Sequence, residues 1–336
     1  MKSNYKIKLL QNSIGKYSYA IFILLLFFIS CDQEKGYELE LPSHFPTPNI
    51  PADNSLTINR INLGKKLFFD PMLSKDTTVS CASCHFPTQA FSDTLPLSRG
   101  IHRNLGKRNA PSLLNVAFVP QLFRDGGVPN LEIQVISPLE NPNEMGFKLR
   151  DAAERLSEND LYQKMSKSAY QREFSPYVLV RALAAYQRTL IGGNSRYDLF
   201  QFQNQKDQLS EGEQRGRQLF FNQKTNCSSC HEGVLFTNFA FENNGLHETY
   251  KDVGRAGVTM KQLDKFKFRV PSLRNVELTA PYMHDGSFAN LEAVIEHYNQ
   301  GGKQHLQQNP LIRPLYLTER EKADLVAFLK SLTHQN

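Results

Sequence analysis

Apolar residues recur at helical spacing in several segments, and no segment alternates apolar and polar residues for long, so the chain is predicted to be mainly α. Near the C-terminus, the capping-box pattern Thr318-x-x-Glu321 predicts the start of a terminal helix. The apolar stripe of that helix consists of Leu325, Val326, Phe328, Leu329 and Leu332.

Two further helices are indicated by their first residues. Ser175-Pro176 predicts a helix that runs to about residue 190, because proline is tolerated at the first helical position. The capping box Ser210-x-x-Glu213 precedes a helix that contains residues 219–221. Between these two helices, Gly192-Gly193-Asn194 is a helix-breaking sequence and predicts a boundary between two domains.

The N-terminus has the pattern of an export signal. Four lysines and no acidic residue fall in residues 1–19, and an apolar stretch follows at 20–29. That stretch is too short for a comfortable membrane-spanning helix. Cys31 follows Ser30 as in a bacterial lipobox, although Phe28 replaces the usual leucine, so a plain secretory signal is the alternative. We expect a lipoprotein-type signal at 1–30, a lipid anchor at Cys31, and a location in the periplasm or cell envelope.

A polar, proline-punctuated tether is predicted over residues 31–54, and two folded domains are expected at 55–192 and 193–336. The formal net charge is +6, of which the leader lysines contribute four, so the rest of the chain carries +2. There is no clustered basic stretch, and we therefore expect no nucleic-acid partner.

Two C-x-x-C-H motifs indicate covalent haem. Cysteine thiols at this spacing add to the two vinyl groups of one porphyrin, and the adjacent histidine binds the iron. The motifs use four of the five cysteines, which leaves no further pair for a tetrahedral zinc site. The chain is thus predicted to bind two haems c through Cys81, Cys84 and His85, and through Cys227, Cys230 and His231.

The chain also repeats itself. Residues 110–116 and 270–276 share P-S-L-x-N-V at an offset of 160, and Asp125-Gly126 matches Asp285-Gly286 at the same offset. N-L-E recurs at 130–132 and 290–292, and G-x-x-L-F-F precedes both haem motifs, at 64–69 and 216–221. The order of these motifs predicts two cytochrome c-like haem domains related by internal duplication.

From about residue 62 to 331, the chain resembles the bacterial di-haem cytochrome c peroxidases and their MauG relatives. The resemblance is carried by L-F-F-D-P-x-L-S before the first haem motif and R-N-x-P-S-L-L-N-V after it. It implies a peroxidatic N-terminal haem, an electron-transfer C-terminal haem, hydrogen peroxide as substrate, and a small cytochrome or cupredoxin as electron donor. The resemblance is also compatible with a homodimer.

The resemblance places Gln134 and Glu144 beside the peroxidatic haem. Splitting the O–O bond of peroxide requires a proton to move from one oxygen to the other, and a carboxyl with a raised pKa can carry it. Glu144 is then the proton carrier, and Gln134 orients the peroxide. The alternative is that Glu144 is an ordinary acid in a polar loop.

The sequence offers more than one candidate for the sixth ligand of each iron. His102 lies six residues before Arg108 and is a candidate ligand of the N-terminal haem, or else a solvated loop histidine. At the C-terminal haem, the position where peroxidases carry methionine is Tyr298, and a tyrosinate ligand there resembles MauG. The other candidates are Met283 and Met260, and Tyr298 could instead be a packed aromatic residue.

A calcium ion between the domains is a further implication of the resemblance, with Asn109, Thr279 and Pro281 at the ligand positions. The chain has no tryptophan, and Arg124 stands where the family usually carries one between the haems. We therefore expect a cytochrome c peroxidase. The alternatives are a MauG-like oxidase that modifies a partner protein and a non-catalytic electron-transfer cytochrome.

Overall fold

The computed structural model describes residues 36–334 of the chain. The apolar stretch 20–29 and Cys31 lie outside these residues, so the export signal and the lipid anchor stay predictions. Within 36–334, no helix combines the length and the apolar character that crossing a membrane would require. The described chain is mainly helical, as predicted, and its one sheet has two short strands.

The α-helices are α2 (Ile58–Phe68), α3 (Leu131–Gln134), α4 (Ile136–Glu140), α5 (Leu149–Ser157), α6 (Asp160–Tyr170), α7 (Pro176–Arg188), α8 (Arg196–Phe202), α9 (Glu211–Phe220), α10 (Ala256–Thr259), α11 (Leu291–Asn299) and α12 (Glu319–Lys330). Strands β1 (Phe241–Glu242) and β2 (Phe268–Arg269) pair antiparallel, with Phe241 opposite Arg269. Short 3-10 helices connect them: η1 (Ala52–Asn54), η2 (Pro71–Leu73), η3 (Cys81–Ser83), η4 (Pro87–Gln89), η5 (Ile101–Arg103), η6 (Val116–Phe118), η7 (Lys206–Gln208), η8 (Cys227–Ser229), η9 (Gln262–Asp264) and η10 (Val276–Leu278).

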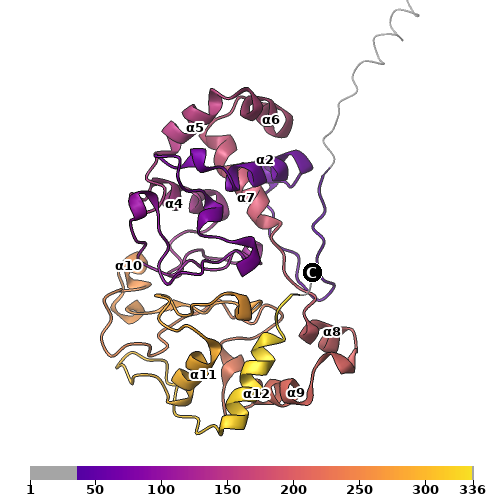
Figure 1. The fold of residues 1–336 in the computed structure, drawn as a ribbon, viewed down its shortest axis with the longest axis vertical. Coiled ribbons are helices and arrows are strands. Elements are labelled where there is room, and N and C mark those ends of the chain that lie inside the picture. Colours follow the sequence, from indigo (N-terminus) through magenta and orange to yellow (C-terminus); the bar gives the residue numbers. More distant parts are fainter. Residues whose placement is uncertain (1–35, 335–336) are drawn as a thin grey trace, which may run out of the picture. The chain divides into compact units, whose positions relative to one another are not determined.

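The same helix pairing occurs twice. Helix α2 packs on α7, and α9 packs on α12, so in each half the helix before the haem motif meets the last helix of that half (Figure 1). A Cβ atom at Gly64 would collide with the carbonyl of Ala182, and one at Gly216 with the carbonyl of Asp324. The glycine of each G-x-x-L-F-F segment therefore lets two helix backbones approach closely.

The two largest hydrophobic cores of the described residues are separate, as expected for two cytochrome c-type domains. The first is built from residues between 63 and 190, and its fully buried members include Leu63, Leu67, Leu156 and Leu179. The second draws on residues between 197 and 332. Its aromatic centre consists of Tyr197, Phe220, Phe236 and Phe328.

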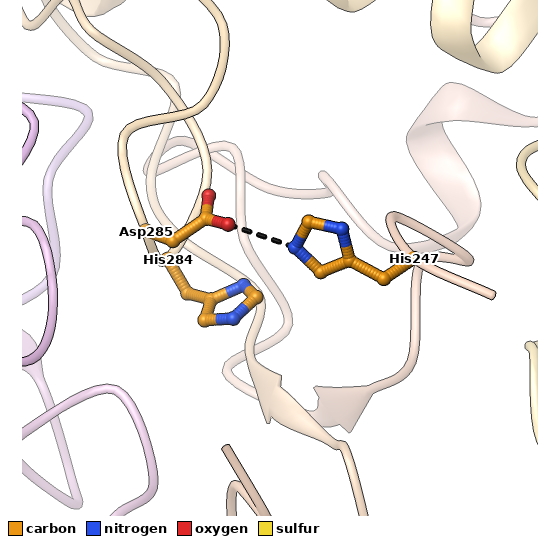
Figure 2. Close-up of side chains that lie close together, drawn as sticks. All are labelled: His247, His284 and Asp285. Carbon is orange, nitrogen blue, oxygen red and sulfur yellow. Dashed lines mark hydrogen bonds and ion pairs between the residues drawn. The ribbon is translucent and has the colours of Figure 1, made fainter. Parts of the chain in front are cut away.

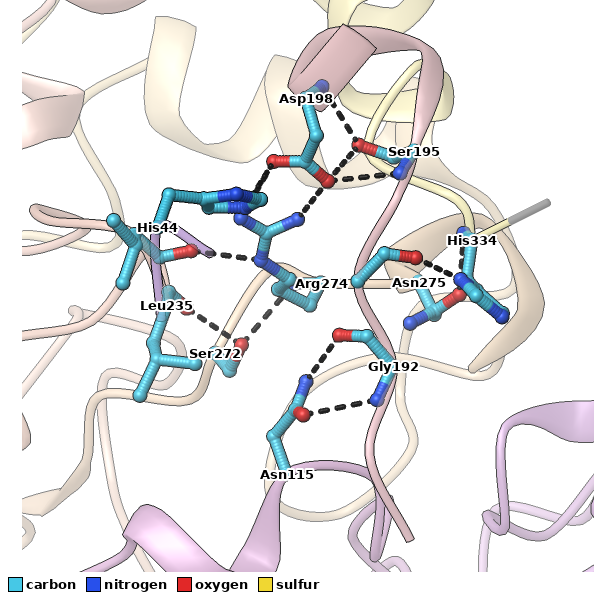
Figure 3. Close-up of polar contacts among 12 residues, drawn as sticks. His44, Asn115, Gly192, Ser195, Asp198, Leu235, Ser272, Arg274, Asn275 and His334 are labelled. Atoms are coloured by element: carbon cyan, nitrogen blue, oxygen red, sulfur yellow. Dashed lines mark hydrogen bonds and ion pairs between the residues drawn. The ribbon is translucent and has the colours of Figure 1, made fainter. Parts of the chain in front are cut away.

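The repeated asparagine of P-S-L-x-N-V has the same conformation and function in both halves. Asn115 and Asn275 have φ angles of 62° and 58°, a left-handed conformation that asparagine tolerates better than most residues. The side chain of Asn115 exchanges hydrogen bonds with the backbone of Gly192, and Asn275 Oδ1 accepts one from the backbone N–H of His334 (Figure 3). Each asparagine thus fastens the chain that follows the last helix of its half.

Part of the expected tether belongs to the folded unit, which begins at Tyr37. Phe45 is buried, and His44 stacks on Phe202 at a ring separation of 4.1 Å. His44 Nε2 also lies 3.1 Å from the Asp198 carboxylate, which accepts two hydrogen bonds from Arg274 (Figure 3). Phe45 packs on Phe118 of the first domain and on Arg274 of the second, so the two aromatic side chains fix this otherwise polar, proline-rich segment to the folded unit.

Candidate haem site

One cavity of about 1190 Å³ contains the side chains of both C-x-x-C-H motifs. The four motif cysteines are free thiols, and burial raises the pKa of Cys81 to about 12, so this thiol is neutral at ordinary pH. Each motif begins on a 3-10 helix, η3 or η8, which places both of its cysteines on the cavity wall. Each motif therefore offers two unpaired thiols to a ligand in the cavity.

The two motif histidines are held in the tautomer that binds iron. His85 donates a hydrogen bond from Nδ1 to the carbonyl of Phe91 at 2.8 Å, and His231 does the same to Phe236 at 3.1 Å. A carbonyl can only accept, so the proton is on Nδ1 and the lone pair on Nε2. Burial lowers the pKa of both imidazoles and keeps them neutral. A neutral imidazole with a free Nε2 is the axial ligand that a c-type haem needs.

Repeated serines support the loops that carry these histidines. Ser112 Oγ donates to the carbonyl of Ala90, and Ser272 Oγ to the carbonyl of Leu235, at 2.5 and 2.6 Å. Ala90 directly precedes Phe91, and Leu235 directly precedes Phe236, the two residues whose carbonyls accept the histidine hydrogen bonds. The cavity, the unpaired thiols and the oriented imidazoles fit two covalently bound haems.

Gln134 and Glu144 both line this cavity. Gln134 ends α3, whose first residues are fixed by Asn130, because its side chain caps the backbone N–H of Ile133. Glu144 lies in the turn after α4, where Asn141 Nδ2 donates to its Oε1 at 2.7 Å. Burial raises the pKa of Glu144, although the hydrogen bond from Asn141 acts in the opposite direction.

His102 lies outside the cavity in the described conformation. Its side chain is 69% exposed, and its Nδ1 lies 3.8 Å from the carboxylate of Asp76. Its φ angle is 55°, in the left-handed region. A ligand role for His102 would therefore require the loop to move, and this role stays a prediction.

Two of the three candidate ligands of the C-terminal haem line the cavity. Tyr298 does so from α11, and burial raises its pKa to about 12. Met283 also lines the cavity, and its sulfur accepts a hydrogen bond from Asn244 Nδ2 at 3.2 Å. Met260 is 84% exposed at the end of α10, away from the cavity wall. Of the three candidates, Tyr298 and Met283 therefore line the cavity and Met260 does not.

The predicted calcium ligands Asn109, Thr279 and Pro281 all line the cavity. The oxygens of Asn109 are already engaged, because Arg124 donates to its carbonyl from Nε at 3.0 Å and to its Oδ1 from Nη2 at 2.6 Å. Asn109 therefore does not fit the role of a calcium ligand while Arg124 holds both of its oxygens.

A histidine pair beside the cavity was not foreseen from the sequence. His247 Nε2 lies 2.8 Å from Asp285 Oδ2, and His284 lies next to both (Figure 2). His284 stacks on Phe268 at 3.8 Å, and burial lowers the pKa of its imidazole to about 4. In the sequence, Asp285 belongs to the repeated Asp-Gly and His284 directly precedes it, whereas His247 lies 37 residues earlier. The hydrogen bond between His247 and Asp285 is sufficient to explain why these side chains lie close together.

Comparisons with known proteins match both halves to haem proteins. Residues 58–207 match the family described as di-haem cytochrome c peroxidase, and residues 213–333 match cytochrome c. MauG of Methylorubrum extorquens is 35% identical over 286 residues, which cover 84% of this chain and 80% of that protein. The cytochrome-c peroxidase IdrP1 of Pseudomonas sp. is 33% identical over 326 residues, covering 86% and 84%.

A solved structure agrees with these relatives. A MauG-like protein associated with microbial copper homeostasis has a TM-score of 0.84 and 34% identity, and the match covers 89% of this chain and 96% of that one. Fold and cavity together define a two-domain c-type cytochrome that holds two haems. The chain belongs to the di-haem cytochrome c peroxidase and MauG family.

Proposed function

We propose that the protein is a peroxidase that reduces hydrogen peroxide to two molecules of water, using two electrons and two protons. The electrons come from a small donor protein, a cytochrome or a cupredoxin, that meets the C-terminal domain. Family membership and relatives named as cytochrome-c peroxidases support this proposal. The haem held by His85 would supply the electron chemistry at the peroxide, and the haem held by His231 would relay electrons from the donor.

The observation that carries the proposal is the position of Glu144. Its carboxyl lines the same cavity as His85, and Asn141 fixes its Oε1, which leaves Oε2 as the atom that takes up or releases a proton. Burial raises the pKa of this carboxyl, so its proton-bound form extends to higher pH than in water. A group poised in this way can move a proton between the two oxygens of peroxide.

The other residues of this wall position the substrate. Gln134 presents an amide to the same cavity, and an amide can both donate to and accept from a peroxide molecule. Val135, Leu139 and Met145 are buried apolar neighbours on the same wall. They limit the water beside the carboxyl and so strengthen its effect on the substrate.

The alternative function is oxidation of a partner protein, as in the relatives named MauG. The specific observation in its favour is Tyr298 on the cavity wall, because an anionic oxygen ligand stabilises oxidised iron. Arg124 argues against it. Arg124 lines the cavity that contains both haem motifs, at the sequence position where the family usually carries tryptophan. A guanidinium, unlike an indole ring, cannot be oxidised to carry an oxidising equivalent to a partner protein.

A matched pair of variants tests the proposal. Glu144→Gln removes the ionisable group from the cavity, and peroxide reduction should slow by about a hundredfold, the usual scale of general acid–base catalysis. Glu140→Gln is the control, because Glu140 lies four residues away, is not on the cavity wall, and accepts from the backbone N–H of Leu149 at 3.0 Å. Equal turnover of both variants and the wild type, with both haems present, would exclude Glu144 as the proton carrier.

A further inference from the structure

Arginine side chains hold the contact between the two haem domains. Arg108 donates to Asp252, Arg255 to the carbonyl of Asp125, and Arg269 to the carbonyl of Phe123. Backbone bonds reinforce this contact. The N–H of Arg269 donates to the carbonyl of Arg124 at 2.7 Å, and the N–H of Asn109 to that of His284 at 2.8 Å. The domain contact is therefore rich in positive charge.

Arg124 takes part in this contact through its carbonyl, and its side chain binds Asn109. Its guanidinium holds both oxygens of Asn109, the side-chain Oδ1 at 2.6 Å and the carbonyl at 3.0 Å. The orientation of the Asn109 amide is defined, because its Nδ2 donates to the carbonyl of Leu95 at 3.3 Å. Asn109 is only 4% exposed, so water does not compete for these oxygens.

We propose that the guanidinium of Arg124 takes the place of the calcium ion that the family resemblance assigns to Asn109, Thr279 and Pro281. Calcium requires six to eight oxygen ligands at about 2.3–2.6 Å. It would have to share the oxygens of Asn109 with a guanidinium already bound to them, and two cations would then lie side by side in a buried site. The positive charge of Arg124 binds the oxygens of Asn109 in place of the metal, so the contact between the two domains does not depend on calcium.

The charges around Arg124 are consistent with a guanidinium, rather than a calcium ion, at this site. Burial and the nearby charges of Arg269 and Arg108 lower the pKa of Arg124 to about 10, so it remains a cation at neutral pH. These same neighbours would repel a divalent ion from the site. The carboxylate of Asp285 acts on Arg124 in the opposite direction, but it is already hydrogen-bonded to His247 and to the backbone N–H of Ser287.

The first test uses the wild-type holoprotein, and its readouts do not depend on the reaction that the protein catalyses. After dialysis against EGTA and then buffer, calcium content is measured by mass spectrometry, and thermal unfolding is followed with CaCl2 or with EGTA. We expect no stoichiometric calcium and the same unfolding temperature in both solutions. Calcium that stays bound through dialysis in a fixed ratio to protein, or unfolding at lower temperature in EGTA, would overturn the proposal.

The second test removes the guanidinium. Arg124→Trp installs the residue usual in the family, and Arg124→Ala leaves the oxygens of Asn109 free without adding bulk. CaCl2 should raise the unfolding temperature of both variants by a few degrees, because a bound ligand stabilises the folded state. Arg255→Gln is the control, since Arg255 belongs to the same contact and bonds Asp125 rather than Asn109. If the Arg124 variants keep both haems but do not respond to calcium, Arg124 is not the substitute and the proposal fails.

Discussion

Arg108 and Asp252 are separated by 144 residues and form a bidentate ion pair that joins the two haem domains. Arg108 donates from Nε to Oδ2 at 2.6 Å and from Nη2 to Oδ1 at 2.9 Å. Its third nitrogen, Nη1, donates to Asp125 Oδ2 at 2.5 Å. Burial alone would raise the pKa of Asp252, but the hydrogen bonds from Arg108 and the backbone of Gly254 outweigh burial and lower it.

Arg108→Met should lower the free energy of unfolding by about 2 kcal/mol, the scale of hydrogen bonds to a charged group. Because the pKa of Asp252 is lowered on folding, the stability from this pair is present above the unfolded pKa, about 3.9, and is lost as pH falls through the folded value. Denaturant unfolding at neutral and acidic pH measures both effects. Arg150→Met, on the exposed surface of α5, is the control. Equal losses in the two variants would contradict a specific role for the pair.

The haem attachments predict a simple gel result. Cys84→Ala and Cys230→Ala should each weaken one covalent attachment, because each motif has two thiols to bind the vinyl groups of one porphyrin. Denatured wild-type protein should keep its haem through electrophoresis, and each variant should give a weaker haem stain. A stain that neither substitution reduces would remove the basis for covalent haem.

Much of the local structure could be predicted from the sequence, because it depends on neighbouring residues. The predicted helix from Ser175-Pro176 to about 190 is α7, which ends at Arg188, and the capping boxes at Ser210 and Thr318 begin α9 and α12. The repeats could also be predicted, because both copies use the same glycine and asparagine positions for the same backbone contacts.

The domain contact could not be predicted in the same way, because it brings together residues that the sequence separates widely. Nothing local to Arg108 points to Asp252, and Arg124 is recognisable in sequence only as a departure from the family tryptophan. The packing of His44 on Phe202 could not be predicted either, because the prolines and polar residues around His44 favour a tether. Such contacts follow from the folded arrangement of two domains rather than from the periodicity of either.

The pKa of Glu144 predicts a pH effect on catalysis. Because burial raises this pKa, the acidic limb of kcat/KM for peroxide should lie above the ordinary glutamate value of about 4.3. The rate should rise with pH through this limb, as the carboxylate that accepts the peroxide proton forms. Glu144→Gln should lose the limb, whereas Glu140→Gln should keep it. An unchanged limb in Glu144→Gln would assign that titration to another group.

The C-terminal haem ligand can be identified from its spectrum. If Tyr298 binds the iron, the ferric protein should lack the near-infrared band of thioether ligation, and its potential should be low. Tyr298→Met should then raise the potential and introduce that band. If wild-type protein already shows the band, Met283 is the ligand, and Met283→Leu should abolish it. Met260→Leu is the control, since Met260 is exposed and lies away from the cavity.

Peroxidase activity itself is tested most directly by stopped-flow mixing of the holoprotein with hydrogen peroxide and a reduced small cytochrome c. The account predicts repeated turnover, in which two molecules of this one-electron donor are oxidised for each peroxide consumed. It also predicts that the haem spectrum returns to its starting state as long as reduced donor remains. A peroxide-induced spectrum that persists while the donor stays reduced would contradict the account and favour the MauG-like alternative.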